Sequence, residues 1–461
     1  MEKKRAQWSS KLGFILAAAG SAVGLGNIWK FPGRAFEGGG GTFLLIYLLI
    51  VVVLGVPMMM TELSVGRAAQ SDVVGAFRAL GHRRWSWVGW IGVLGAFLIT
   101  GYYAHVGGWV LRYVAGYLTE PDAIFSDAPG YFFRMLGLGA DGNTFFPWTA
   151  IIFAAVFMAL TAAVIVSGVA GGIERFNKVG MPTLFVLLLV LLGRALTLPG
   201  AAPGLRYMLS FDWSKFNFDT VLSALGQAFY SLSIGMSIMI TYGSYLSKEE
   251  HIVRNTVLIC GMDTLVAMIA GFIIVPAVFA TLGAGEVGKG GGFAFVSLAG
   301  VFQQMPGGRW FALLFYLLLL FAALTSCVSL VEGIVAFLTE QWGMSRKGAA
   351  IGVSAVMYLI GVLYTCSQAA YPIKGVWLDA GGVAFPAFCD ALEYLTDRLL
   401  IPVCALGCCI FVGWVWKPEN AVEEIGSFRL AGAYRFIVKY LAPLAILTIL
   451  VMSFATGRTL S

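Results

Sequence analysis

The stretch Gly20–Pro32, GSAVGLGNIWKFP, places small and polar residues inside the first long apolar segment of the chain. Lipid offers a backbone no hydrogen-bond partner, so a helix that crosses a bilayer normally continues without a break. Glycine and serine inside such a helix are most often close-packing positions against a neighbouring helix. The alternative is that the helix unwinds here and exposes its backbone to a ligand. Features elsewhere in the sequence decide between the two.

The composition indicates a membrane protein with many spans. Of the 461 residues, 59% are hydrophobic and only 12% are charged, and the mean hydropathy is +0.85. Apolar runs long enough to cross the hydrocarbon layer recur along the chain and are too long for barrel strands. We expect an all-α polytopic fold of eleven helices, the first retained and not cleaved, at residues 12–35, 42–66, 88–117, 149–168, 177–196, 218–245, 254–282, 309–339, 347–366, 388–416 and 431–455.

A second interrupted segment matches the first. Residues Gly226–Tyr245, GQAFYSLSIGMSIMITYGSY, carry Ser231, Ser233, Gly235 and Ser237 at their midpoint. Two broken helices, the first and the sixth, in equivalent places of two five-helix halves are typical of inverted-repeat secondary transporters. The two clusters together favour unwinding over packing. The sequence therefore predicts one transporter domain over 1–461, with repeats at about 10–200 and 215–416 and an extra helix at about 431–455.

Charge and cysteine usage fit a transporter without cofactor chemistry. The net charge of +6 comes from Lys and Arg residues at helix ends on one side, which indicates topology and not nucleic-acid binding. This asymmetry predicts a cytoplasmic amino terminus and, with eleven helices, an external carboxyl terminus. The seven cysteines lie mostly in apolar segments and predict neither disulfides nor a zinc site. No nucleophile and base pair, phosphate loop or metal-ligand spacing predicts an enzyme, and no protein partner is evident.

Unwinding supplies two kinds of ligand. Freed carbonyl oxygens are hard donors that suit an alkali cation. The half-helix that resumes near Leu25 and Gly26 presents amide N–H groups and a positive dipole end to an anion such as a carboxylate. The sequence thus predicts a midplane site where a cation and a carboxylate bind together.

Several motifs resemble one family in order along the chain. GSAVGLGNIWKFP, EGGGGTFLLIY, GYYAHVGGW, GQAFYSLSIGMS, DTLVAMIAGF and ALTSCVSLVEG are similar to those of bacterial neurotransmitter:sodium symporters, over residue 5 to about residue 455. Many members have twelve helices, and stopping after eleven resembles a bacterial subgroup. The resemblance implies a Na⁺-coupled symporter of the bacterial inner membrane that imports an amino acid by alternating access.

The resemblance also implies two sodium sites. The first would comprise the backbone of Ala22, the side chains of Asn27, Ser231 and Asp263, and the substrate carboxylate. The second would comprise the carbonyls of Gly20, Val23 and Ala322 and the hydroxyls of Thr325 and Ser326. The segment AALTS places that carbonyl and both hydroxyls within about one helical turn, as an all-oxygen shell needs. The competing interpretation is that the two hydroxyls only bond back to the preceding turn.

For the substrate, the resemblance implies a pocket with a charged end and an apolar end. The amino group would meet the carbonyls of Ala22, Tyr230 and Ser231 and the Ser233 hydroxyl. The carboxylate would meet the Leu25 and Gly26 amides and the Tyr103 phenol. The side chain would be enclosed by Ile99, Tyr230, Met236, Ser326 and Leu330. Monoamine carriers of the family have Asp where this chain has Gly24, so we expect an amino acid, neutral and hydrophobic.

Gates and anion dependence follow from the same resemblance. Lys30 and Glu393 would form an outer gate above a lid of Tyr103 and Tyr230, and Lys30 stands where most members have Arg. Arg5 and Glu340, beside Trp8 and Tyr245, would close the cytoplasmic path. Each of these charges has the competing interpretation of an ordinary interfacial residue. Chloride-dependent members hold the anion with groups corresponding to Tyr47, Gln227 and Ser231. They have Asn where this chain has Asp263, so no chloride is expected.

Other intramembrane polar residues leave two alternatives open. His105 follows Tyr103 by two residues and should point elsewhere, as a packed side chain. Glu62 and Glu332 are expected to be partnered structural groups. One alternative is a protein that binds the amino acid but signals without transporting it. The other is a proton-coupled transporter with His105 or Asp263 as the carrier.

Overall fold

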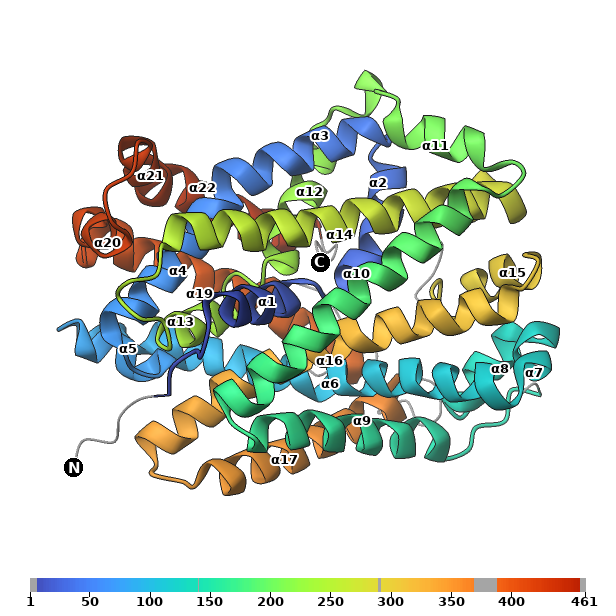
Figure 1. Cartoon of the computed structure of the whole chain (residues 1–461), viewed down its shortest axis with the longest axis horizontal. Helices are drawn as coiled ribbons and strands as arrows, with labels where there is room; N and C mark the ends of the chain where they lie inside the picture. The colour runs from blue at the N-terminus through green and yellow to red at the C-terminus, as the bar shows by residue number, and fades with distance from the viewer. Residues whose placement is uncertain (1–5, 140, 289–291, 369–387, 457–461) are drawn as a thin grey trace.

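The chain folds almost entirely into helices. The computed structural model describes residues 6–139, 141–288, 292–368 and 388–456 (Figure 1). Arg5 of the expected inner gate lies outside these residues. The α-helices are α1 Lys11–Ala22, α2 Phe31–Glu37, α3 Gly41–Ile50, α4 Val56–Ala69, α5 Val73–Ala79, α6 Ser86–Thr119, α7 Pro121–Ser126, α8 Ala128–Met135, α9 Trp148–Val166, α10 Arg175–Leu196, α11 Ala201–Leu209, α12 Phe218–Ser231, α13 Ile238–Gly243, α14 Ile252–Thr281, α15 Ser297–Gln303, α16 Gly308–Gln341, α17 Arg346–Gln368, α18 Phe388–Glu393, α19 Ile401–Ile410, α20 Pro418–Ile425, α21 Ala431–Phe436 and α22 Ala442–Thr456.

The long helices agree closely with the expected spans. In the described part of the chain, nine helices are long and apolar enough to cross a membrane, and one bent pair passes the same test together. That pair, α1 with the segment Gly26–Glu37, bends by 53°. The expected sixth span, 218–245, is present as α12 and α13 with a break between them. Neither piece alone is long enough to cross a membrane. The division into two repeats stays a prediction.

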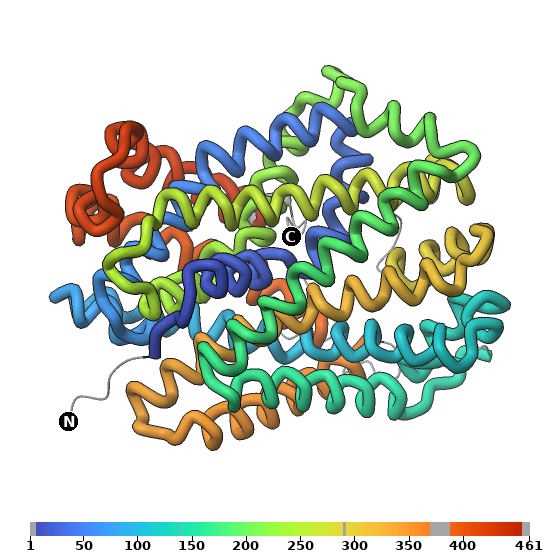
Figure 2. Tube along the Cα trace, viewed as in Figure 1, coloured from blue at the N-terminus to red at the C-terminus, as the bar shows by residue number. Residues whose placement is uncertain are grey.

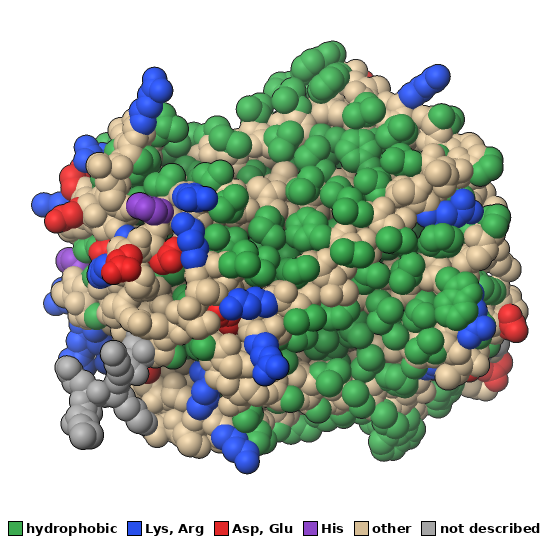
Figure 3. Space-filling view, viewed as in Figure 1, with side chains coloured by type: hydrophobic (Ala, Val, Ile, Leu, Met, Phe, Trp, Pro, Cys, Tyr) green, Lys and Arg blue, Asp and Glu red, His purple; other side chains and the backbone are tan. Residues whose placement is uncertain are grey.

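Apolar side chains cover the middle of the molecule. Figure 3 shows a broad hydrophobic face, with charged side chains gathered mainly at the end that carries α5, α20 and α21. Val186, Ile152 and Leu189 are more than half exposed, although they are large and apolar. Water would penalise such a surface, whereas lipid tails match it. The surface therefore supports the membrane assignment made from composition.

The two broken helices lie among long unbroken ones. Helix α1 contacts α10, α14 and α16, and α10 crosses it closely (Figure 2). Helix α6 packs along α16 and α9, and α13 packs on α4. Long helices that pack against each broken helix hold the breaks in place, as a functional site at membrane depth requires. The centre of the bundle is where the site is built.

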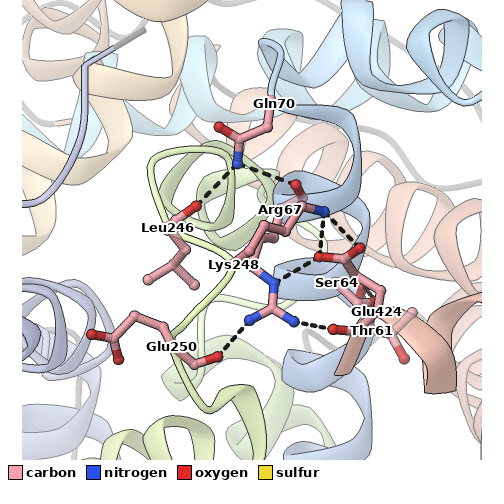
Figure 4. Close-up of polar contacts among 8 residues, drawn as sticks. All are labelled: Thr61, Ser64, Arg67, Gln70, Leu246, Lys248, Glu250 and Glu424. Atoms are coloured by element: carbon pink, nitrogen blue, oxygen red, sulfur yellow. Dashed lines mark hydrogen bonds and ion pairs between the residues drawn. The ribbon is translucent and has the colours of Figure 1, made fainter. Parts of the chain in front are cut away.

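A polar cluster fixes the end of the molecule near the amino terminus. Arg67, only 3% exposed at the end of α4, pairs with Glu424 of α20 through Nε and Oε1 at 2.7 Å (Figure 4). Its guanidinium also donates to the Glu424 and Glu250 carbonyl oxygens. Lys248 Nζ lies 2.7 Å from the same carboxylate. Gln70 donates to the carbonyls of Arg67 and Leu246. The cluster joins three elements: α4, α20 and the segment that follows α13.

Candidate functional site

The first helix unwinds where the sequence predicted. Helix α1 ends at Ala22, Val23 is extended, and a π-helical turn, Gly26–Lys30, begins after it. The backbone amides that would continue the helix do not bond to the carbonyls four residues earlier. Gly24 N–H donates to Asn27 Oδ1 at 3.2 Å, Leu25 N–H to the Tyr103 hydroxyl at 3.4 Å, and Asn27 N–H to the Gly24 carbonyl at 3.3 Å.

These bonds leave backbone oxygens available. In an α-helix the three amides would have bonded to the carbonyls four residues earlier, those of Gly20, Ser21 and Val23. Those oxygens instead face the Ser326 hydroxyl, at 3.4, 3.2 and 3.3 Å. A hydroxyl has one proton and can satisfy only one of the three at a time. The break therefore creates a surplus of acceptors, which suits a cation.

The sixth span breaks in a different way. After α12 ends at Ser231, Ser233, Gly235 and Ser237 all have positive φ angles, of 55°, 79° and 61°. A β-carbon on Gly235 would lie 2.5 Å from the Ile401 carbonyl, so both the angle and the space require glycine. The freed Gly235 amide donates to Glu62 Oε1 at 2.8 Å. A buried carboxylate thus stabilises the unwound turn.

A cavity lies between the two breaks. All eleven residues predicted to touch a substrate line it, and four further residues complete its wall. A β-carbon on Gly24 would lie 3.1 Å from Ser326 Oγ and 3.3 Å from the Tyr103 hydroxyl, so any side chain at position 24 would enter this space. The lining residues are Ser21, Ala22, Gly24, Leu25, Gly26, Asn27, Ile99, Tyr103, Tyr230, Ser231, Ser233, Met236, Ile238, Ser326 and Leu330.

Beside the cavity, one oxygen cluster carries a carboxylate. Asp263 of α14 is fully buried, and its Oδ1 accepts from Asn27 Nδ2 at 2.7 Å. The Ser231 hydroxyl lies 2.8 and 2.9 Å from its two oxygens and also accepts from Asn27 Nδ2 at 2.8 Å. No Lys, Arg or His of the described residues lies within ion-pair distance of Asp263. The structure thus brings three of the residues expected for the first sodium into contact around a buried carboxyl group that has no basic partner among the described residues.

The residues expected for a second sodium form another cluster. Ser326 faces the freed carbonyls of Gly20 and Val23. The Thr325 hydroxyl bonds to the Phe321 and Ala322 carbonyls of its own helix at 3.0 and 3.1 Å. The predicted back-bonding is thus present for Thr325, whereas Ser326 spans the gap between α16 and α1. A cation would take the Thr325 oxygen without breaking the bond that its proton makes.

The expected outer-gate residues lie on a second cavity that adjoins the first. Its wall includes Lys30, Glu393, Asp397, Tyr103 and Tyr230, and its volume is about 290 Å³. Lys30 Nζ lies over the Tyr230 ring at 4.9 Å, and the Tyr364 hydroxyl donates to Glu393 at 2.5 Å. In the described part of the chain no ion pair within 4.0 Å joins Lys30 to Glu393.

The segment before α1, which carries the expected inner-gate residue Trp8, is bonded to α13 and the turn after it. Trp8 Nε1 donates to the Tyr242 carbonyl at 3.1 Å, and its amide donates to the Tyr245 carbonyl at 3.3 Å. The Tyr245 hydroxyl donates to Glu332, which also pairs with Arg346 at 2.5 Å. This confirms that Glu332 is a partnered group. Glu340 Oε2 accepts from the Asp72 amide at 2.7 Å.

Other polar residues lie outside the cavity. His105 is buried, and its ring nitrogens lie 3.2 Å from the Tyr358 carbonyl and 2.8 Å from the Thr365 hydroxyl. Gln227 Nε2 donates to the Gly26 carbonyl at 3.4 Å. Its Oε1 is buried with no hydrogen-bond partner in the described part of the chain, and the Tyr47 hydroxyl is buried beside Asp263.

Known proteins similar to this chain show its family. The chain matches the sodium:neurotransmitter symporter family over residues 5–123 and 147–461. The chain belongs to that family. It is 34% identical over 463 residues to a protein of Haemophilus influenzae named an uncharacterized sodium-dependent transporter, covering 97% of this chain and 98% of the other. The symporter is also 35% identical to the uncharacterized sodium-dependent transporter YhdH of Bacillus subtilis, covering 97% of each chain.

A solved structure shares the fold of the symporter. The crystal structure of MhsT in complex with L-phenylalanine superposes with a TM-score of 0.85 at 36% identity, covering 97% of this chain and 99% of that one. A more distant relative, named the sodium- and chloride-dependent GABA transporter ine of Drosophila melanogaster, is 29% identical over 464 residues, which span 87% of this chain and 48% of the other. The symporter is therefore a transporter and not an enzyme.

Two features of the site were not predicted from the sequence. Asp397 lines the outer cavity and accepts from the Tyr102 hydroxyl at 3.1 Å. Asp397 follows Glu393 by four residues, so the two side chains share one helix face. This spacing was a signal that the sequence contained. Glu174 accepts from the hydroxyls of Ser9 and Ser10 at 2.6 and 2.7 Å and holds the start of α1. No sequence signal joins residues so far apart.

Proposed function

We propose that this symporter imports neutral, hydrophobic L-amino acids with Na⁺ by alternating access, without chloride. The single observation that carries the proposal is the arrangement of the cavity between the two breaks. Its carboxylate end would be the amides of Leu25 and Gly26 with the Tyr103 hydroxyl, and Tyr103 already contacts Leu25. The two oxygen clusters adjoin this cavity, so cations and substrate can share ligands.

The two oxygen clusters would each hold one Na⁺. At the cluster of Asn27, Ser231 and Asp263, the substrate carboxylate would complete the shell. At the cluster of Gly20, Val23, Ala322, Thr325 and Ser326, all ligands are neutral oxygens, the hard donors that an alkali ion takes. We further propose that the end bearing Trp8 and Arg67 faces the cytoplasm, because Lys and Arg residues gather there (Figure 3). The carboxyl terminus is then outside.

The cavity wall supports this substrate class. Ile99, Met236, Ile238 and Leu330 form an apolar end, and Met can adapt its shape to different side chains. MhsT, which shares the fold, was crystallised with L-phenylalanine. An apolar end opposite a carboxylate end suits an amino acid with a hydrophobic side chain.

Met236→Phe is expected to shift the preference towards smaller amino acids. The larger ring would overfill the apolar end, and overfilling a packed site costs about 1–3 kcal/mol. The uptake of L-alanine relative to that of L-leucine and L-phenylalanine should therefore rise by about tenfold or more. Met268→Phe, on α14 outside the cavity, is the control. An unchanged ranking in Met236→Phe would contradict the assigned position of the side-chain pocket.

Uptake into sealed vesicles tests the proposal directly. Purified protein in liposomes should accumulate L-phenylalanine when an inward Na⁺ gradient is imposed, with gluconate as the only anion. A protein that only senses the amino acid would bind it without accumulating it. A proton-coupled carrier would accumulate it under an inward proton gradient without Na⁺. Either result would overturn the proposed function.

A further inference from the structure

Asn177 lies where three helices meet at the second oxygen cluster. It sits on α10, which contacts α1 and α16 and crosses α1 in the bundle (Figure 2). Its side chain is fully buried. The amide nitrogen Nδ2 donates to the Ile173 carbonyl at 2.9 Å, one turn back on its own helix. That bond identifies the other terminal atom, Oδ1, as the one turned away from α10.

The Asn177 oxygen lies against Gly20, a member of the second cluster. It lies 2.2 Å from the point that a β-carbon on residue 20 would occupy, and Thr325 Cβ lies 3.2 Å from the same point. Gly20 and Thr325 are both members of that cluster. The absence of a side chain at position 20 is what lets the Asn177 oxygen approach the backbone of the broken helix. Alanine at position 20 would collide with it.

No hydrogen-bond donor among the described residues reaches this oxygen. Asn177 Oδ1 is a buried polar atom without a partner, which is rare in folded proteins. The surrounding cluster has the same imbalance. It contains the freed carbonyls of Gly20 and Val23, while the Thr325 proton is directed at its own helix. Several buried oxygens with few protons among them are satisfied together by a positive ion.

We propose that Asn177 Oδ1 supplies a further oxygen ligand to the second cation. The inference rests on the proposed sodium-coupled function and adds a ligand from α10 to a shell otherwise built from α1, α16 and the break between them. An amide oxygen is a hard, neutral donor suited to Na⁺. It would also link the position of α10 to cation binding, because the ligand moves with that helix.

The test measures Na⁺ binding without amino acid. The melting temperature of the purified full-length protein is followed as NaCl replaces choline chloride, and the Na⁺ concentration at half-maximal shift is recorded. Omitting the amino acid leaves the first shell incomplete, so the second site dominates the shift. Asn177→Leu, which keeps the size but removes the oxygen, is expected to raise that concentration about tenfold or more. Asn177→Asp, which keeps the oxygen and adds charge, is expected to lower it.

Asn255 on α14 offers a matched control. It is also fully buried, its Nδ2 donates once, to Glu250 at 2.9 Å, and its Oδ1 also has no partner among the described residues. Asn255→Leu should leave the Na⁺ midpoint within about twofold of the wild type, because this oxygen lies outside both clusters. The control separates loss of a buried amide from loss of a cation ligand.

Each outcome decides the proposal. Equal midpoints in Asn177→Leu and Asn255→Leu would overturn it, as would an Asn177→Asp midpoint that rises like that of Asn177→Leu. If Asn177→Leu does not fold, Asn177→Asp decides alone: a lowered midpoint supports the ligand role, and an unchanged or raised one contradicts it. A wild-type protein that Na⁺ does not stabilise would overturn the proposed function itself. Failure of the Asn177 proposal alone differs from this, because Na⁺ then stabilises the wild type while Asn177→Leu and Asn255→Leu have equal midpoints.

Discussion

Asp263→Asn is expected to make uptake depend on chloride. In the structure this buried carboxylate bonds to Asn27 and Ser231 and has no basic partner among the described residues. It would therefore balance the charge of the first Na⁺. Leaving a buried charge without its partner costs about 3–5 kcal/mol. In gluconate the apparent Na⁺ affinity of the mutant should fall by more than about 100-fold.

Chloride should restore much of that loss. The Tyr47 and Ser231 hydroxyls both adjoin residue 263, where an amide would replace the negative charge. Na⁺-driven uptake is measured with chloride present and with chloride replaced by gluconate. Asp219→Asn, the same chemical change at an exposed site, should behave as wild type. A wild type that needs chloride, or a mutant equally active in both anions, would show that Asp263 is not a built-in anion.

Tyr103→Phe should weaken substrate binding without unfolding the protein. Removing one donor from a buried carboxylate costs about 1–3 kcal/mol, which corresponds to a loss of about 5- to 150-fold in affinity. The loss should be confined to ligands that have a free carboxylate. The comparison is therefore between L-phenylalanine and its methyl ester, both measured by equilibrium binding in Na⁺.

A tyrosine on the same helix provides the control. Tyr113 is buried, and its hydroxyl donates to the Phe295 carbonyl at 3.2 Å, away from the cavity. Tyr113→Phe should keep the wild-type preference for the acid over the ester. If Tyr103→Phe also keeps that preference, then Tyr103 does not hold the carboxylate.

Helix positions were readable from the sequence because lipid imposes a simple rule. Apolar runs of sufficient length must be helices, and so the expected limits, such as 254–282, differ by only a residue or two from α14, Ile252–Thr281. The two breaks were also readable, because two matched clusters of small and polar residues at membrane depth favour unwinding over close packing. Just before the first break, a β-carbon on Gly20 would lie 2.2 Å from Asn177 Oδ1.

Contacts between distant segments were not readable without a structure. The resemblance to a family named most of the cavity wall, since its motifs carry those residues. It did not show that Lys30 would lie over Tyr230, or that Glu174 would hold Ser9 and Ser10. Such pairs depend on side-chain direction and helix rotation. A single sequence fixes neither, because one residue of helix phase changes a side chain's direction by about 100°.

Reciprocal binding of Na⁺ and L-phenylalanine tests the central claim most directly. If the substrate carboxylate and Asn27 share one ion, each ligand must raise the affinity for the other by the same factor. Equilibrium binding of L-phenylalanine is measured across a Na⁺ titration against N-methyl-D-glucamine, and Na⁺ binding is measured with and without the amino acid. The account predicts two equal coupling factors of about tenfold or more. Equal affinity for L-phenylalanine in Na⁺ and in N-methyl-D-glucamine would contradict it.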